Sequence, residues 1–295
     1  MRIRHLLPLI SLTALLSACE KGYEAETEVS TTAEEGSTAV SFNIVSISQT
    51  DFDGTVYATR AADLSEYCTR INLAAFDASG TKSTVNQTSS DSDFGTLTLS
   101  LSEGTYDVVI LAHSGTGNAT ISSVDEIKFT NNKMTDTFLY YTQITVEGTT
   151  SYDISLARVV AMFRLIVTDA TPSDVAQMQF YYTGGSSTLD ATTGFGCVNS
   201  RQTEVRDVDD TAYTGQSQYE VYTLPHATDD SLKIVVSALD SLGTTLYERT
   251  FTDVPVTVNK ITQYTGEFFG ASTEQGASTL TLTISDEWSL EEYEY

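Results

Sequence analysis

The sequence has few of the residues that build metal centres, disulfide frameworks or membrane-spanning helices. It contains three cysteines and three histidines in 295 residues, and only His113 and His226 lie beyond the first 18 residues. A zinc site needs clustered cysteine or histidine ligands, so we expect no metal site and no cofactor. No nucleophile elbow, phosphate loop or dinucleotide fingerprint occurs, and the sequence predicts no enzymatic activity.

Basic residues are also scarce. Lysine and arginine number 15 against 40 aspartates and glutamates, which gives a formal net charge of −25. Such a surface repels nucleic acid and anionic lipid, so a nucleic-acid partner is excluded. An apolar content of 40% and an aromatic content of 10% still suffice for a hydrophobic core. The length accommodates two domains of about 100 to 150 residues each.

The N-terminus carries an export signal. Arg2 and Arg4 precede an apolar run over residues 6–18, too short for the about 20 residues that cross a bilayer. The run ends Leu-Ser-Ala before Cys19, which matches the bacterial lipobox. We therefore predict a lipoprotein signal peptide over residues 1–18 and lipidation (palmitate) of Cys19; an ordinary cleaved signal with an incidental Cys19 is the alternative. Its removal leaves 13 basic against 40 acidic residues, a net charge of −27.

The next segment, residues 19–37, is polar and acidic, and it predicts a flexible tether. Two cysteines remain beyond it, Cys68 and Cys197, and we expect no bridge between them. The acidic groups at residues 51–54 and 207–210 lack the full pattern of a calcium loop and are interpreted as solvated loops.

Alternating apolar and polar residues follow, which is the period of half-buried β-strands. Residues 97–101 and 106–112 predict an antiparallel hairpin with a turn at Glu103 and Gly104. Residues 157–167 place six apolar side chains at successive odd positions and predict one long strand, with a buried helix as the alternative. The neighbouring tyrosines at 140–141 and at 181–182 would each place one ring in the core.

The fold class predicted is all-β, with two tandem β-sandwich domains. The pattern of alternation is interrupted at Gly148, Thr149 and Thr150. We place the domain boundary there, with an N-terminal sandwich over residues 38–148 and a C-terminal sandwich over residues 149–295.

Several segments resemble the fimbrillin superfamily of the Bacteroidales, the subunits and lipid-anchored components of type V pili. They are residues 71–80 (INLAAFDASG) with 97–112 (LTLSLSEGTYDVVILA), residues 156–195 with an Arg-x-x-Ala strand and a proline turn, and residues 259–269 (NKITQYTGEFF). The resemblance implies transthyretin-like Greek-key sandwiches, attachment to the outer membrane and assembly with other fimbrial subunits by strand donation.

The resemblance also implies site residues. Stalk subunits of the superfamily lose their first strand by cleavage after an arginine, and Arg60 (in YATRAADL) is the candidate, with Arg70 a poorer one. Cleavage at Arg60 would discard the lipid with the first strand, whereas an uncut chain stays tethered. A donor strand is expected at residues 279–285, where Leu280, Leu282 and Ile284 alternate with threonines. An ordinary last strand of the chain's own sheet is the alternative.

The leading hypothesis is a non-enzymatic fimbrial subunit, an anchor or accessory component of an adhesive filament. It would be a surface-exposed lipoprotein of the outer membrane whose partners are other fimbrial subunits and a host or bacterial surface receptor. The alternative is a surface glycan-binding lipoprotein of a polysaccharide-uptake system, which would share the signal, the tether and the β-domains. An exposed aromatic platform would favour that alternative, and the single tryptophan is Trp288.

Overall fold

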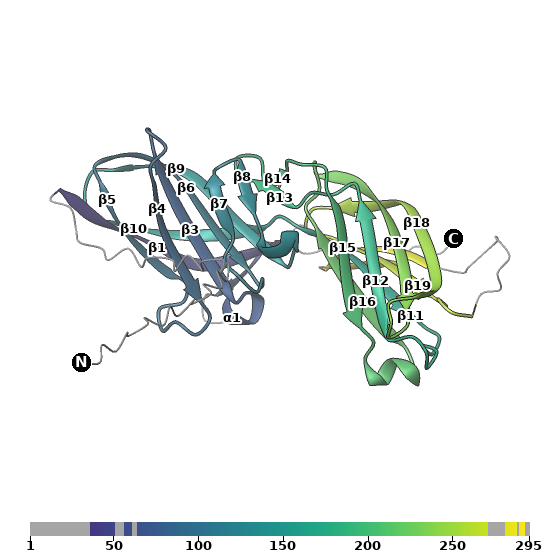
Figure 1. Ribbon diagram of the computed structural model, residues 1–295. Helices are drawn as coiled ribbons and strands as arrows, with labels where there is room; N and C mark the ends of the chain where they lie inside the picture. Colours follow the sequence, from purple (N-terminus) through teal and green to yellow (C-terminus); the bar gives the residue numbers. More distant parts are fainter. Residues whose placement is uncertain (1–35, 51–55, 61–63, 271–280, 288, 293–295) are drawn as a thin grey trace, which may run out of the picture. The chain divides into compact units, whose positions relative to one another are not determined.

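The computed structural model describes residues 36–50, 56–60, 64–270, 281–287 and 289–292, and Figure 1 shows their arrangement. These residues form β-strands joined by turns, with one short α-helix, α1 (Leu64–Tyr67), and two short 3-10 helices, η2 (Thr130–Asn132) and η3 (Asp210–Tyr213). Strands packed face to face around apolar cores confirm the prediction of an all-β sandwich fold.

The largest sheet has eight strands. Seven of them are hydrogen-bonded in the order β2-β1-β10-β9-β6-β3-β4, and β5 pairs with β1 outside this order. It folds into two layers, because β10 and β9 share only two residue pairs at a corner. One layer contains β1 (Ser37–Thr50), β2 (Val56–Arg60), β5 (Thr96–Ser102) and β10 (Thr150–Arg158). The other contains β3 (Arg70–Asp77), β4 (Lys82–Thr88), β6 (Gly104–His113) and β9 (Thr137–Val146).

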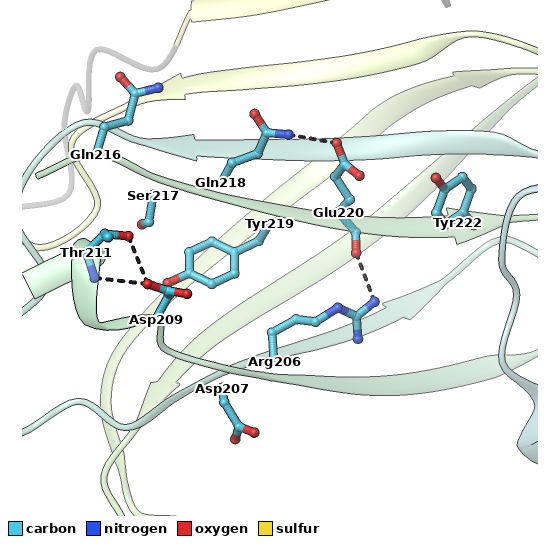
Figure 2. Close-up of a pocket in the computed structure, with 10 residues that line it drawn as sticks. All are labelled: Arg206, Asp207, Asp209, Thr211, Gln216, Ser217, Gln218, Tyr219, Glu220 and Tyr222. Atoms are coloured by element: carbon cyan, nitrogen blue, oxygen red, sulfur yellow. Dashed lines mark hydrogen bonds between the residues drawn. The ribbon is translucent and has the colours of Figure 1, made fainter. Parts of the chain in front are cut away.

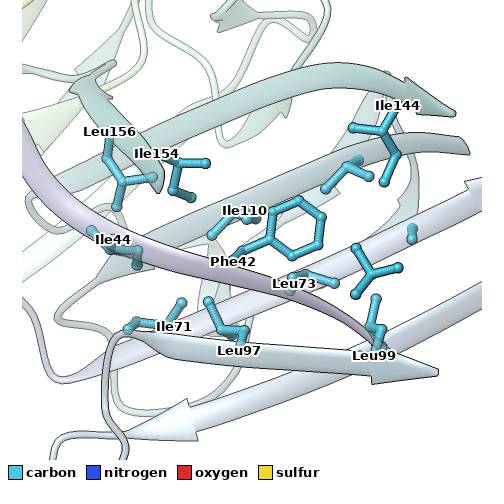
Figure 3. Close-up of a cluster of buried hydrophobic side chains, with 14 of the residues drawn as sticks. Phe42, Ile44, Ile71, Leu73, Leu97, Leu99, Ile110, Ile144, Ile154 and Leu156 are labelled. Carbon is cyan, nitrogen blue, oxygen red and sulfur yellow. The ribbon is translucent and has the colours of Figure 1, made fainter. Parts of the chain in front are cut away.

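Apolar side chains from both layers form the first core. Phe42 of β1, Leu97 of β5 and Ile154 of β10 pack with Leu73 of β3 and Ile110 of β6, all of them 2% exposed or less. Figure 3 shows these side chains converging between the strands. The period of two in each strand sends one face to this core.

A second sandwich has one sheet in the order β16-β11-β19-β20-β21 and another in the order β15-β12-β17-β18. Its core cluster runs from Ala161 to Phe268 and includes Phe163, Phe180 and Phe251. The first sheet contains β11 (Ala161–Val167), β16 (Ser217–Thr223), β19 (Ile261–Gly266), β20 (Thr281–Glu287) and β21 (Ser289–Glu292). The second contains β12 (Gln177–Thr183), β15 (Arg201–Asp207), β17 (Asp229–Leu239) and β18 (Thr245–Thr257).

A small third sheet joins segments that lie far apart in the sequence. Its order is β14-β13-β8-β7, and β8 pairs with β13 through Leu189 opposite Ile127. A third apolar cluster, which includes Val159, Val160 and Leu224, lies beside it. The strands are β7 (Thr120–Ser123), β8 (Glu126–Lys128), β13 (Thr188–Asp190) and β14 (Phe195–Gly196).

The predicted hairpin at residues 97–112 is wrong. β5 pairs with β1, whereas β6 pairs with β3 and β9 in the opposite layer. Gly104 has a φ of 153° at the crossing between the layers. Both strands are half-buried with a period of two, so the sequence found the strands but not their partners.

The predicted long strand at residues 157–167 is also wrong. It is two strands, because β10 ends at Arg158 in the first sandwich and β11 begins at Ala161 in the second. Val159 and Val160 between them are buried in the third cluster. Apolar residues therefore continue through the break between the two strands. The alternation of apolar and polar residues does not show where the first strand ends.

Three smaller expectations have mixed outcomes. Tyr182 is fully buried and Tyr181 is exposed, as predicted, but Tyr140 and Tyr141 are both half-buried because each faces a different apolar cluster. Cys68 and Cys197 are unbridged. Asp209 is exposed and caps the start of η3, where its carboxylate accepts hydrogen bonds from the Thr211 backbone N–H and hydroxyl.

Candidate functional site

The first strand lies in the middle of its layer. β1 pairs in parallel with β10 from Val40 opposite Thr150 to Ser48 opposite Ala157. On its other side it pairs antiparallel with β5 over residues 37–43 and with β2 over residues 46–50. A strand bonded along both edges cannot leave without breaking two ladders and opening a groove between its neighbours.

The inward side chains of β1 fill that groove. Val40, Phe42, Ile44 and Ile47 are each 2% exposed or less. The Phe42 ring stacks on that of Tyr152, with 5.4 Å between centroids and 18° between planes. Burying each such side chain is worth about 1.5–3 kcal/mol, so β1 contributes a large part of the stability of the first sandwich.

A bulge changes the phase of β1. Ile44 and Ser46 pair with consecutive residues of β10, which makes Val45 an extra residue on this strand. Val45 is 42% exposed. After it the alternation resumes one residue later, so that Ile47 faces the core. A β-bulge of this kind fixes the register of the strand.

Polar contacts fix the outward face of β1. Asn43 donates from Nδ2 to Ser151 Oγ at 3.0 Å and to Asp153 Oδ1 at 3.1 Å, both on β10. The hydroxyls of Ser41 and Thr98 of β5 lie 2.9 Å apart. These contacts connect β1 to both of its neighbouring strands.

Arg60 is the last residue of β2, and its backbone pairs with Ser46 of β1. A cut after Arg60 would therefore remove both β1 and β2. Arg70 lies in β3, where its guanidinium donates to Gly115 O at 3.0 Å and to Thr116 O at 2.9 Å. Cys19 lies outside the described residues.

The expected donor segment pairs with its own chain. Leu282 of β20 is opposite Tyr264 of β19, and Ile284 is opposite Thr262. Leu280 lies outside the described residues. β20 thus continues the sheet that contains β11 and β16.

Hydrogen bonds fix the chain just after the end of β19. The carboxylate of Asp169 accepts backbone N–H bonds from Phe268, Phe269 and Gly270 at 2.7 to 2.8 Å. Arg249 donates twice to Phe268 O, at 2.9 and 2.7 Å. Phe268 is 2% exposed, so residues 268–270 are fixed to the second core.

Arg158 is a buried charged residue that the sequence pattern did not predict. Arg158, which is 5% exposed, donates to both oxygens of Asp136 at 2.6 and 2.7 Å and to Asn259 Oδ1 at 3.0 Å. It connects the ends of β9 and β10 to the turn between β18 and β19. Because Asp136 and Asn259 lie far from Arg158 in sequence, the alternation of residues could not reveal these partners.

His113 is another buried polar residue. Its Nδ1 accepts the Gly115 backbone N–H at 3.0 Å, so the proton is on Nε2, which donates to Asn72 Oδ1 at 2.9 Å. Burial, and then the nearby Arg70, lower the pKa of His113 to about 4. The imidazole is therefore neutral near pH 7 and acts as a structural element of the β3–β6 pair.

Neither a metal centre nor a membrane helix was found in the residues that the structure describes. They contain no group of three or more histidine, cysteine, aspartate or glutamate side chains placed to hold a metal ion. No helix among them is long and apolar enough to span a bilayer.

Three solved structures are similar to this chain at low identity. The fimbrial anchor protein Mfa2 from Porphyromonas gingivalis is 13% identical with a TM-score of 0.43, over 87% of this chain and 100% of that chain. A fimbrial assembly protein from Parabacteroides distasonis is 10% identical with a TM-score of 0.41, over 86% and 98%. A Bacteroides thetaiotaomicron protein with a proposed polysaccharide-binding role is 9% identical with a TM-score of 0.48, over 87% and 98%.

Family membership comes from the sequence match. No curated protein matches the chain. The model of the fimbrillin-A associated anchor proteins Mfa1 and Mfa2, however, matches residues 27–294, which is nearly the whole chain and includes both sandwich cores. The chain therefore belongs to the family of fimbrillin-A associated anchor proteins Mfa1 and Mfa2, and it is a fimbrial subunit.

Proposed function

We propose that this subunit is a non-enzymatic anchor or accessory component of an adhesive filament. A lipid on Cys19 tethers it to the outer membrane, and β-strand donation joins it to other fimbrial subunits. Its remaining contacts are with a surface receptor. The two sandwich cores correspond to two transthyretin-like domains in this proposal.

The position of β1 is the observation that supports an anchor. The expected tether, residues 19–37, leads into β1, whose first residue is Ser37. β1 is bonded along both edges and fills the first core, so a pull on the lipid is transmitted directly to a sandwich. An uncut chain also fills its own groove, and its first sandwich needs no strand from a neighbour.

Replacement of the lipidated cysteine tests the anchor. Cys19→Ala in the full chain should remove the protein from the outer-membrane fraction and abolish labelling with a palmitate analogue. Arg60→Ala is the matched control and should leave both unchanged if β1 is retained in the native protein. Persistence of Cys19→Ala in the membrane fraction would refute the lipid anchor.

Charged substitutions in β20 test strand donation. If Leu282 and Ile284 enter a groove of another subunit, Leu282→Asp and Ile284→Asp should abolish multimers that survive detergent until boiling. Thr283→Asp is the control, because it adds the same charge at a position of the opposite phase. Equal loss in all three variants, or in none, would count against donation by this segment.

A further inference from the structure

The outer face of the sheet β15-β12-β17-β18 carries an exposed tyrosine. Phe180 and Tyr182 of β12 face the second core, so the odd-numbered residues of this strand face away from it. Tyr181 is 38% exposed, and it lies opposite Thr203 of β15 and Val235 of β17. This face of the sheet therefore presents an aromatic ring to the solvent.

Two basic residues flank the ring at one level of the sheet. Thr183 lies two residues beyond Tyr181 on the same face, opposite Arg201 of β15 on one side and Lys233 of β17 on the other. Side chains placed diagonally across neighbouring strands in this way are within reach of an aromatic ring. Both basic residues are exposed, and neither forms an ion pair within the part of the chain that the structure describes.

These two cations contrast with the composition of the chain. It has 40 acidic against 15 basic residues, so carboxylates are available in excess to pair with arginine and lysine. The other arginine at this end of the sheet, Arg206 of β15, is paired. It donates to Glu204 Oε2 at 2.7 Å and to Glu220 O at 2.9 Å, and Figure 2 shows the second contact. Arg201 and Lys233 thus leave two charges on the outer face for an anionic ligand.

A cavity continues the site beyond the edge of β15. It has a volume of about 260 Å³, and both Arg201 and Lys133 line it. Gln202 lines it as well and is 6% exposed. Its Nε2 donates to Asn132 O at 2.8 Å, whereas its Oε1 has no hydrogen-bond partner among the described residues. A buried acceptor without a donor costs free energy, and a hydroxyl group of a ligand would supply that donor.

The combination of these groups selects the chemistry of the ligand. An arginine can donate two parallel N–H groups to a carboxylate. The ring of Tyr181 offers a flat surface to an apolar partner, and Gln202 lacks a donor. A uronic acid carries a carboxylate, a ring with an apolar C–H face and hydroxyl donors, whereas an acidic peptide side chain carries the carboxylate alone.

We propose that this outer face binds an acidic polysaccharide, with a uronate carboxylate between Arg201 and Lys233 and a neighbouring sugar ring stacked on Tyr181. The inference rests on the receptor contact proposed above and names its chemical class. It does not depend on the lipid or on strand donation. Binding by the isolated chain can therefore fail while both of those proposals hold, and the reverse is equally true.

Calorimetric titration of the full chain with an oligogalacturonate tests the proposal. A neutral galactose oligomer of the same length and poly-glutamate are the comparison ligands, since the first lacks the carboxylates and the second lacks the sugar rings. The chain should bind the oligogalacturonate, more weakly at high salt, and should bind neither comparison ligand comparably. No binding of the oligogalacturonate, or equal binding of either comparison ligand, would overturn the proposal.

Variants of the outer face locate the binding. Arg201→Ala and Tyr181→Ala should each weaken binding about tenfold, because they remove the carboxylate donor and the stacking surface. Tyr181→Phe keeps the ring and should bind like the unmodified chain. Lys82→Ala is the matched control, because it removes an exposed positive charge from β4 of the first sandwich.

Circular dichroism of each variant should match that of the unmodified chain, because Arg201 and Tyr181 are exposed and their truncation leaves the cores intact. Unchanged binding by Arg201→Ala or by Tyr181→Ala would overturn the proposal. Equal weakening by Lys82→Ala would overturn it as well, because the ligand would then respond to the net charge of the chain rather than to this face.

Discussion

Truncation of Phe42 measures how firmly the first strand belongs to its sandwich. Phe42 is fully buried and stacks on Tyr152 at 5.4 Å. Phe42→Ala removes the buried ring and leaves a cavity, which in protein cores costs about 3–5 kcal/mol. The stacking within that total is about 0.5–1.5 kcal/mol. Since a domain is stable by only about 5–15 kcal/mol, the variant should lose between about a fifth and all of that stability.

Urea unfolding followed by circular dichroism is the assay for this loss. Val45→Ala in the same strand is the control, because Val45 is 42% exposed at the bulge and its truncation should cost less than about 0.5 kcal/mol. Tyr152→Ala should be less costly than Phe42→Ala, since Tyr152 is only half-buried. A loss below about 1 kcal/mol for Phe42→Ala would refute the claim that β1 is an integral part of the first core.

Three further predictions concern buried polar groups. Asp136→Ala should destabilise the chain by about 3–5 kcal/mol in urea unfolding because it leaves Arg158 buried without its carboxylate, and adding Arg158→Met should recover most of the loss; no recovery would contradict this reading. The pKa of His113 is lowered from 6.5 to about 4, so its contribution to stability is complete above pH 6.5 and is lost as the pH falls through 4. At pH 5 it should have lost about 2 kcal/mol, measured as the difference between the unmodified chain and His113→Gln, and equal pH dependence of the two would be inconsistent with a buried neutral imidazole. Asp169→Ala frees three backbone N–H groups at residues 268–270, and their hydrogen exchange, measured by mass spectrometry, should accelerate at least tenfold. Unchanged protection would show that Asp169 does not fix this segment.

The alternation of residues was sufficient to predict the strands and the class of fold. Val40, Phe42 and Ile44 alternate with polar residues in the sequence and lie in the core, because a half-buried strand needs only its own sequence to show which face is apolar. Partners of strands do not follow from that pattern. β5 and β6 are adjacent in sequence and equally amphipathic, yet they belong to opposite layers.

The burial of charged residues could not be predicted from the sequence either. Arg158 and Glu204 are 5% and 6% exposed, at positions where the composition alone would place them in solvent. Arg158 is stabilised by Asp136, which folding brings to it, whereas Glu204 is paired with Arg206, which lies on the same strand and the same face. The sequence could not reveal the bulge at Val45 either, because an extra residue in one strand is recognised only by its pairing with the strand opposite.

The N-terminus of the native mature protein is the most direct test of the central claim, that this fimbrial subunit keeps β1 and the lipid that precedes it. Mass spectrometry of the protein isolated from cells should identify an acylated Cys19 as the first residue, with β1 and β2 still attached. A chain that begins at Ala61, after cleavage at Arg60, would contradict the account, because both strands and the lipid would then be lost.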